Sequence, residues 1–180
     1  AQKAMELVVG DPVCEKTQVG ALISEAHLKK IESYVELAKQ EGGSVLAGGK
    51  RSIVSDALAQ GAFWEPTVVG GLSPDCRTAT EEIFGPVVTL HPFKTEEEAV
   101  QIANSVRYGL SASVWTTSLS RAHRVSAELD TGMVWVNSWL LRDLRVPFGG
   151  MKDSGVGREG GTNSLEFYSE SRNICIRLEG

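Results

Sequence analysis

The sequence is poor in cysteine and histidine, with three of each among its 180 residues. Cys14, Cys76 and Cys175 are odd in number and widely spaced. This usage excludes a framework of disulfide bonds and suits a reducing compartment. No cysteines or histidines are paired at the spacing of metal ligands, so we expect no metal site.

The sequence also has no excess of basic residues, and its formal net charge is −5 at pH 7. A nucleic-acid-binding domain would carry a basic surface, so that class is excluded. No apolar run approaches the length of a membrane span, and no signal peptide pattern opens the printed sequence. We therefore expect a cytoplasmic protein whose partners include neither nucleic acid nor a membrane.

The composition that remains is that of a globular protein, with 42% hydrophobic and 23% charged residues, and it can bury a sizeable core. Residues 24–40 have the period of an amphipathic helix. Its apolar face consists of Leu28, Ile31, Val35 and Ala38. Short strands are expected at 45–47 and 65–69, with a surface excursion of the chain at 51–64.

Strand and helix patterns then alternate over residues 87–136. The expected elements are a buried strand at 87–90, a helix from a capping box at Thr95 to Ala103, a strand at 111–115, a helix capped by Ser118 or Ser120 and ended by Gly132, and a strand at 133–136. Such alternation is typical of parallel βαβ units. The expected fold is α/β, with three layers and a mainly parallel sheet. A half-exposed strand is expected at 172–178.

Residues 147–161 are rich in glycine, with six glycines in fifteen residues. Glycine loses the most backbone freedom on ordering, so neither a helix nor a strand is expected here. The segment also carries Phe148, Lys152 and Arg158, which a flexible linker does not need. An ordered loop that forms a site is the favoured reading, and a flexible linker is the alternative.

Residues 155–160 match the dinucleotide fingerprint G-x-G-x-x-G, but the context is wrong. The fingerprint follows an apolar strand and opens a helix within a βαβ unit. Residues 147–154 are not an apolar strand, so we reject this match. No G-x-x-x-x-G-K-[ST] phosphate loop is present in the sequence either.

The run Glu81-Glu82-Ile83-Phe84-Gly85-Pro86 comes just before an expected strand. Loops at strand ends are where α/β proteins place ligands. A carboxylate can accept hydrogen bonds from sugar hydroxyls, and an aromatic ring can lie against a planar heterocycle. The alternative is a charged turn closed by Gly-Pro.

Several motifs in order resemble the aldehyde dehydrogenase superfamily across nearly the whole chain. They are Val9-Gly10-Asp11-Pro12, Gly61-x-Phe63-x-x-Pro66-Thr67, Glu81 to Pro86, Tyr108-Gly109-Leu110, Gly132-x-Val134-Trp135-Val136-Asn137, and Pro147 to Glu159 with its glycines. The segments at 20–24 and 139–144 are most similar to the branch that acts on muconic semialdehydes. The resemblance implies NAD-dependent oxidation of an aldehyde to an acid.

The resemblance also implies roles for single residues. Glu82 and Phe84 would bind the cofactor NAD, through the ribose on the nicotinamide side and the nicotinamide ring. Asn137, Arg142 and Phe148 would line the entrance for the aldehyde substrate. Within this segment the Arg142 guanidinium suits a carboxylate on the substrate, and the alternatives are a structural ion pair of Arg142 with Asp143 or a helix end, and Arg145 sharing or taking the carboxylate. The remaining assignments are Glu159 as a candidate proton relay, and Arg158 with Glu170 as a pair near the subunit interface of a homo-oligomer.

In this family a cysteine thiolate attacks the aldehyde and a glutamate base helps to hydrolyse the thioester. Neither the motif of that cysteine nor the Rossmann domain is found in residues 1–180, and none of the three cysteines has the nucleophile's local signature. We therefore expect a fragment, with a partial catalytic domain at 1–165 and an oligomerisation strand segment at 166–180. Alone it should be inactive and bind NAD weakly or not at all. The alternatives are a fragment of an acylating, CoA-dependent relative and a non-catalytic assembly module.

Overall fold

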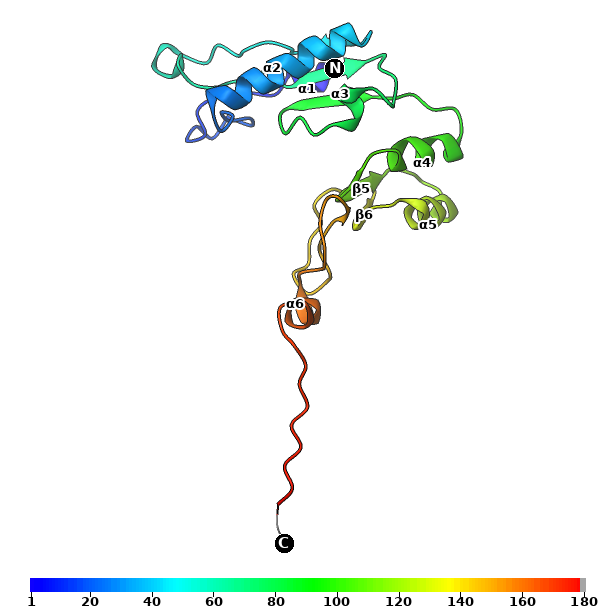
Figure 1. Cartoon of the computed structure of the whole chain (residues 1–180). Coiled ribbons are helices and arrows are strands. Elements are labelled where there is room, and N and C mark those ends of the chain that lie inside the picture. The colour runs from blue at the N-terminus through cyan, green and yellow to red at the C-terminus, as the bar shows by residue number, and fades with distance from the viewer. Residues whose placement is uncertain (179–180) are drawn as a thin grey trace. The chain divides into compact units, whose positions relative to one another are not determined.

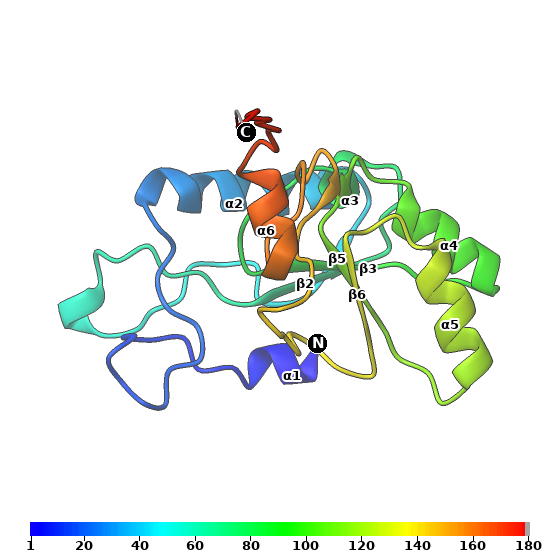
Figure 2. The same ribbon diagram turned by 90° about the horizontal axis from the view of Figure 1, so that it is seen from below.

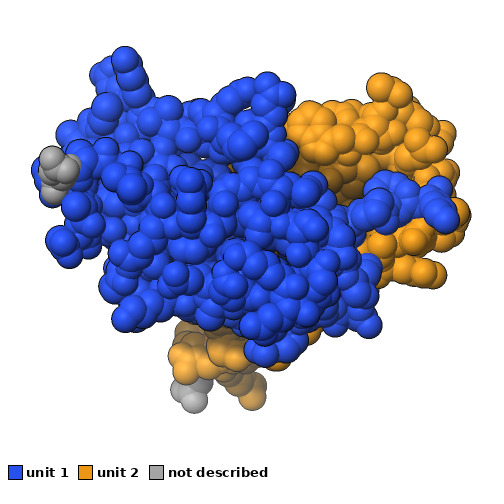
Figure 3. Space-filling view, turned by 90° about the horizontal axis from the view of Figure 1, so that it is seen from above, with its two compact units in different colours: residues 1–94 blue, residues 95–180 orange. Residues whose placement is uncertain are grey.

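The structure is a computed structural model that describes residues 1–178, apart from the side chain of Asp56. The chain divides into two compact units, residues 1–94 and 95–180, which are coloured separately in Figure 3. The boundary after Lys94 is one that the sequence did not predict. None of the helices within residues 1–178 is long and apolar enough to cross a membrane.

Unit 1 is a three-stranded sheet covered by one long helix (Figure 1). Its elements are α1 Gln2–Met5, α2 Glu25–Gln40, β1 Ser44–Ala47, a 3-10 helix Asp56–Leu58, β2 Thr67–Gly70, α3 Arg77–Thr80 and β3 Val87–Leu90. Strand β2 lies in the middle, antiparallel to β1 and parallel to β3. The predicted helix is confirmed, and the Ser24 hydroxyl caps it by accepting from the His27 amide at 3.1 Å.

The core of unit 1 lies between α2 and the segments beside it. One cluster of buried side chains consists of Leu28, Ile31, Val35, Ala62, Trp64 and Ile83, and a second of Ala38, Val69 and Leu72. The predicted apolar face of α2 is therefore the buried face. Residues 51–64 were expected on the surface, but Ala62, Phe63 and Trp64 at the end of this segment are buried, because their apolar side chains pack into the core.

Strand β3 was expected to be buried and is not. Val88 and Leu90 are 52% and 46% exposed. The strand is an edge of the sheet order β1-β2-β3, and within unit 1 its outward side chains have no covering layer. The prediction relied on a β-branched run, which indicates a strand but does not identify which strands lie at an edge.

Unit 2 contains a short parallel pair of strands with its crossover helix. Its elements are α4 Glu96–Asn104, β4 Tyr108–Gly109, β5 Ser111–Val114, α5 Leu119–Glu128, β6 Met133–Val136, β7 Met151–Lys152 and α6 Gly161–Phe167. Helix α5 contacts both β5 and β6, and α4 contacts α5 (Figure 2). Strands β5 and β6 are parallel, as the βαβ pattern predicted. The Thr95 and Ser118 hydroxyls cap α4 and α5.

The α/β class and its parallel pairings are confirmed, but the strands form three separate short sheets within residues 1–178. The predicted strand at 172–178 is absent from the structure, where residues 169–178 follow α6 without a helix or a strand (Figure 1). Alternating residues need a neighbouring strand to form a ladder, and no described segment pairs with these.

The glycine-rich segment of unit 2 is an ordered loop, as favoured above. Phe148 and Glu159 exchange two backbone hydrogen bonds, at 2.7 and 2.8 Å, which bring the ends of the loop together. Strand β7 in the middle pairs with β4. The loop passes so close to Gly132 that a Cβ there would overlap the carbonyl oxygen of Gly149. Two backbones therefore meet at a position that has no room for any side chain.

Candidate active-site segments

The loop between α3 and β3 presents two side chains to solvent on either side of a buried one. Ile83 is only 8% exposed and belongs to the larger core cluster. Glu82 is exposed, and the Phe84 ring is 74% exposed. The Glu82 carboxylate accepts no hydrogen bond from any of residues 1–178. Ile83 thus anchors the loop, and its two neighbours are free to bind a ligand.

Phe84 has an unusual backbone conformation, with φ at +60°. A non-glycine residue held in a sparsely populated region costs of the order of 1–3 kcal/mol and persists only where its surroundings enforce it. Here His27 Nε2 donates to the Phe84 carbonyl oxygen at 2.5 Å. The two rings also meet edge to face, with centroids 6.0 Å apart. The next position, Gly85, has no room for a side chain, because a Cβ there would overlap the buried Ile31 side chain.

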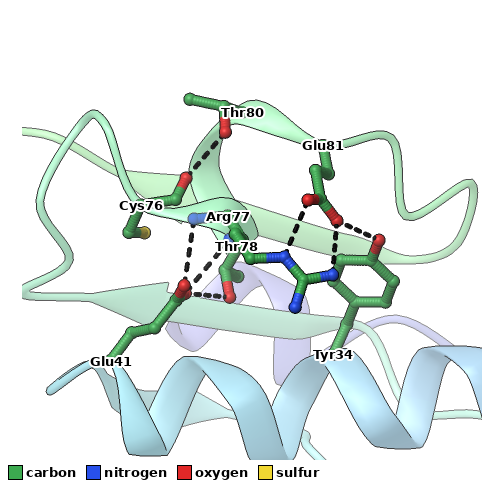
Figure 4. A network of polar contacts seen from close by, with 7 residues as sticks. All are labelled: Tyr34, Glu41, Cys76, Arg77, Thr78, Thr80 and Glu81. Atoms are coloured by element: carbon green, nitrogen blue, oxygen red, sulfur yellow. Dashed lines mark hydrogen bonds and ion pairs between the residues drawn. The ribbon is translucent and has the colours of Figure 1, made fainter.

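The neighbouring Glu81 is held in a polar network, which Figure 4 shows. Its carboxylate accepts from Arg77 Nε at 2.7 Å and Arg77 Nη2 at 3.1 Å, and from the Tyr34 hydroxyl at 2.6 Å. These bonds, with Arg77 first, lower the pKa of Glu81 to about 2, and the Glu81 carboxylate raises the pKa of Tyr34. Of two adjacent carboxylates, Glu81 is engaged and Glu82 is available.

Glu41, the residue after α2, holds the start of the short helix α3 (Figure 4). Its carboxylate accepts from the amides of Arg77 and Thr78 at 2.9 and 3.1 Å, and from the Thr78 hydroxyl at 2.6 Å. These bonds, led by that of the Thr78 hydroxyl, lower the pKa of Glu41. A carboxylate at a helix N-terminus satisfies amides that have no partner inside the helix. Glu41 therefore fixes α3 and, through it, the loop that follows.

A groove of about 320 Å³ lies between this loop and β3. Its lining residues are Thr78, Ala79, Glu81, Ile83, Phe84, Gly85, Val87, Val88 and Thr89. A groove with both polar and apolar lining, beside an exposed ring and an unengaged carboxylate, suits a ligand that has both a flat heterocycle and a sugar. The residues present therefore fit the nicotinamide half of NAD, which would meet the Phe84 ring and the Glu82 carboxylate.

In unit 2 the structure brings together three of the predicted site residues, Arg142, Phe148 and Glu159. The Arg142 guanidinium lies 4.1 Å from the centre of the Phe148 ring. Its Nη2 donates to Glu159 Oε1 at 3.0 Å. The side chains of Arg142 and Glu159 are 45% and 53% exposed. A guanidinium has five N–H donors, and this single bond leaves others free for a second carboxylate.

The nearby Arg145 is engaged differently. It donates through Nε and Nη2 to the Asp143 carboxylate, at 2.5 to 3.1 Å. This pair lowers the pKa of Asp143. Asp143 is thus the partner of Arg145, and Arg142 bonds Glu159 instead. Of the two arginines in this segment, Arg142 is the one that lies over an aromatic ring.

Two other predicted site residues hold backbone in place. The Asn137 side chain accepts from the Thr116 amide at 2.9 Å and donates to the Thr116 carbonyl at 2.8 Å. Arg158 Nη1 donates to the carbonyls of Gly150 and Gly157, at 2.9 and 2.7 Å. Glu170 is exposed and forms no ion pair with another residue of 1–178, so the predicted pair of Arg158 and Glu170 is not brought together within the chain. The substrate role of Asn137 and the interface role of that pair stay predictions.

Cys76 does not have the surroundings of an activated thiol. Cys14 and Cys175 are exposed, and Cys76 is half-buried. Burial raises the pKa of the Cys76 thiol, whereas a reactive cysteine needs a lowered one. Within residues 1–178 no group of histidine, cysteine, aspartate and glutamate side chains could hold a metal ion.

The sequence reasoning missed the residues that hold the Glu81 to Phe84 loop. Tyr34 and Glu41 bond residues 36 to 47 positions away, and His27 bonds one 57 positions away. No local pattern marks such partners. The one signal was the border of the α2 apolar face, where polar side chains with long reach stand beside buried ones.

The chain belongs to the aldehyde dehydrogenase family, whose profile matches residues 1–174. It is 52% identical over 179 residues to the 2-aminomuconic 6-semialdehyde dehydrogenase of a Pseudomonas species, and 51% identical over 175 residues to the 2-hydroxymuconic semialdehyde dehydrogenase of Pseudomonas sp. strain CF600. These matches cover 99% and 97% of the chain but 36% of each relative. The chain therefore spans about a third of the length of these curated relatives.

A solved structure of the family has the same fold. The betaine aldehyde dehydrogenase of Staphylococcus aureus, in complex with NAD+, superposes with a TM-score of 0.88 at 41% identity, over 93% of this chain and 33% of that one. The semialdehyde branch suggested by the segments at 20–24 and 139–144 agrees with the two Pseudomonas relatives.

Proposed function

We propose that the chain is part of an NAD-dependent aldehyde dehydrogenase that oxidises a carboxylate-bearing semialdehyde to the acid. One observation carries the proposal. The Glu81 to Phe84 loop engages Glu81 and buries Ile83, and it leaves the Glu82 carboxylate without a hydrogen bond from residues 1–178 and the Phe84 ring 74% exposed. A free carboxylate beside an exposed ring supplies the two contacts that the nicotinamide half of NAD needs.

In this proposal Glu82 accepts hydrogen bonds from the ribose hydroxyls, and the Phe84 ring contacts the nicotinamide. When bound, NAD supplies the acceptor for the hydride that leaves the substrate. Glu82 and Phe84 orient that acceptor, and correct orientation of reacting groups accounts for a large share of enzymatic rate. The NAD+ complex of the 41% identical Staphylococcus enzyme supports this choice of cofactor.

Arg142 supports the choice of substrate class. The two Pseudomonas relatives are named for semialdehydes of substituted muconic acid, which keep one carboxylate. The Arg142 guanidinium is half exposed over Phe148 and uses one described bond to Glu159. Charge-assisted bonds to a substrate carboxylate are about twice as strong as neutral ones. Glu159 would then hold Arg142 as well as relay protons near the substrate.

We also propose a cytoplasmic homo-oligomer, in which residues 1–165 contribute to the catalytic domain and 166–180 form the oligomerisation segment. Ile174, Ile176 and Leu178 alternate and are at least 64% exposed, which suits a strand that pairs with another chain. Residues 179–180 of this segment lie outside the described residues.

The test is a chimaera in which this chain replaces the matching 36% of the 2-aminomuconic 6-semialdehyde dehydrogenase of the Pseudomonas species. The purified chimaera should produce NADH from a semialdehyde acid and release the free acid. The isolated 180-residue chain should produce none and bind NAD weakly or not at all. A folded chimaera that leaves NAD unreduced would overturn the proposal, and activity only with CoA, yielding an acyl-CoA, would replace it with the acylating alternative.

A further inference from the structure

Three polar side chains form one stripe along helix α2. His27, Lys30 and Tyr34 stand at positions i, i+3 and i+7, which lie on one side of an α-helix. Each is next to a residue of the buried face, namely Leu28, Ile31 and Val35. The stripe therefore runs along the edge of the face that α2 buries.

The three side chains bond the Glu81 to Phe84 loop, here called the cofactor loop, in reverse chain order. The Tyr34 hydroxyl donates to Glu81 Oε2 at 2.6 Å. Lys30 Nζ donates to the carbonyl oxygen of Glu82 at 3.0 Å. His27 Nε2 donates to the carbonyl oxygen of Phe84 at 2.5 Å. Lys30 Nζ also lies 5.7 Å from the centre of the Tyr34 ring, which links neighbouring members of the stripe.

The loop is therefore held at four consecutive residues. The stripe bonds Glu81, Glu82 and Phe84, and the residue between the last two, Ile83, is buried in the same cluster as Leu28 and Ile31. The three hydrogen bonds use two backbone carbonyls and the carboxylate of Glu81, and the His27 ring also meets the Phe84 ring edge to face. None of the hydrogen bonds uses the carboxylate of Glu82. This arrangement also accounts for the persistence of the strained φ at Phe84.

We propose that His27, Lys30 and Tyr34 are positioning residues for the cofactor, and we call this stripe the α2 clasp. The clasp sets where the Glu82 carboxylate and the Phe84 ring stand, and so fixes the nicotinamide for hydride transfer. This inference rests on the proposed function. A displacement of about 1 Å in a reacting group can cost roughly 100-fold in rate. Loosening the clasp therefore lowers kcat more than it weakens the binding of NAD.

The clasp can be loosened by small changes. Tyr34→Phe removes one hydroxyl, and Lys30→Met removes one donor while keeping the aliphatic stem. Lys29→Met is the matched control, since Lys29 carries the same charge on the same helix, and its side chain is exposed and bonds none of residues 1–178. Lys30→Arg keeps a cationic donor and serves as the rescue.

The kinetic arm uses the chimaera. In Lys30→Met and Tyr34→Phe we expect kcat to fall about tenfold, KM for NAD to change by less than about twofold, and the isotope effect from a deuterated aldehyde to rise. Lys29→Met should match the unsubstituted chimaera, and Lys30→Arg should recover most of the lost rate. A lower melting temperature with unchanged kcat and isotope effect would show that the stripe only stabilises the fold, and would overturn the positioning role.

The second arm measures amide hydrogen exchange in the 180-residue chain and needs no activity. Exchange should become faster at the amides of Glu81 and Thr67, which donate to the Arg77 and Pro86 carbonyls at the two ends of the loop, in Lys30→Met and Tyr34→Phe but not in Lys29→Met. Unchanged exchange would overturn the clasp itself. If the unsubstituted chimaera fails to reduce NAD, the proposed function and the cofactor half of this inference fall together, while exchange still decides whether α2 holds the loop.

Discussion

Glu81 and Glu82 are adjacent and chemically identical, yet the structure gives them opposite tasks. The Glu81 carboxylate is bonded by Arg77 and Tyr34, so it belongs to the protein. The Glu82 side chain is exposed, and the backbone carbonyl of Glu82 is the group that Lys30 holds. A substitution at Glu82 therefore removes a ligand contact without removing a contact of the fold.

Replacing Glu82 with glutamine tests this division. In the chimaera we expect Glu82→Gln to lower kcat by about 10- to 100-fold, because a poorly held ribose displaces the nicotinamide. KM for the aldehyde should change little, and the melting temperature should be unchanged. Steady-state kinetics and thermal unfolding are the measurements. A lower melting temperature with normal turnover of the folded enzyme would mean that Glu82 only stabilises its turn.

Arg142 and Arg145 allow a matched comparison of two cations in one segment. Arg142 lies over Phe148 with donors to spare, whereas Arg145 is tied to Asp143. We expect Arg142→Ala to lower kcat/KM at least about tenfold on a semialdehyde acid and much less on an uncharged aldehyde of similar length. Arg145→Ala should affect both substrates alike. Equal losses on both substrates in Arg142→Ala would eliminate recognition of the carboxylate.

At the scale of the element, the short helix α3 depends on residues far away in the sequence. It has four residues, too few for a stable helix in isolation, and the Glu41 carboxylate bonds its first amides. Its Arg77 side chain then bonds Glu81. Glu41 at the C-terminal end of α2 thus holds the start of α3, and side chains along α2 hold the cofactor loop.

The bonds of Arg77 and Tyr34 to the Glu81 carboxylate predict that the stability of unit 1 decreases in acid. The pKa of Glu81 falls from an ordinary 4.5 to about 2 in the folded chain. A lowered pKa contributes stability that is full above the unfolded value and is lost as pH falls from about 4.5 towards 2. The melting temperature of Glu81→Gln should therefore lie below that of the unsubstituted chain at neutral pH, and the difference should shrink as pH falls through this window. A difference that stays constant from about pH 6 to about pH 3 would contradict it.

Elements with local signals were predictable, and those made by distant contacts were not. Ser24, Thr95 and Ser118 cap their helices through bonds three residues away, so the sequence alone predicts where these helices begin. Helix α3 was missed because its capping carboxylate, from Glu41, lies 36 residues upstream of Arg77. The strand expected at 172–178 has the right alternation, but pairing requires a neighbour that alternation does not specify.

The candidate site divides in the same way. Glu82 and Phe84 were found because the Glu81 to Pro86 run is contiguous and precedes a strand. The individual residues Arg142, Phe148 and Glu159 were also found, through the resemblance to a family. Their assembly was not, because it requires the backbone bridge between Phe148 and Glu159. The α2 clasp was missed entirely, since its three side chains find their partners only in the folded chain.

At the scale of the whole molecule, the two units differ in how much apolar surface they bury. Among residues 1–178, every buried apolar side chain except Ala122 belongs to unit 1. Unit 2 instead exposes large apolar side chains, including Trp115, Trp139, Leu141 and Leu144, each at least 59% exposed. Large exposed apolar areas mark surfaces that bind other protein, and three of these side chains fall within residues 139–144. Unit 2 is therefore the part of the chain that most needs a covering surface.

The isolated chain should consequently self-associate. Light scattering should give a mass well above 19.4 kDa at tens of micromolar, falling on dilution. Placing charges on the alternating C-terminal segment, as in Ile174→Lys with Ile176→Lys, should reduce the association, since charged edges resist pairing. The charge-preserving change Arg177→Lys is the control. A mass of 19.4 kDa at all concentrations would show that these surfaces are not adhesive.

The contact between Gly132 and Gly149 has a consequence for the gene. Every residue other than glycine would place a Cβ at position 132, where there is no space beside the Gly149 carbonyl. All four glycine codons begin with GG and differ only in the third base. Val156, in the same loop, is 89% exposed and has no such limit. The coding sequence can drift freely at codon 156, whereas at codon 132 only third-base changes are silent in both protein and fold.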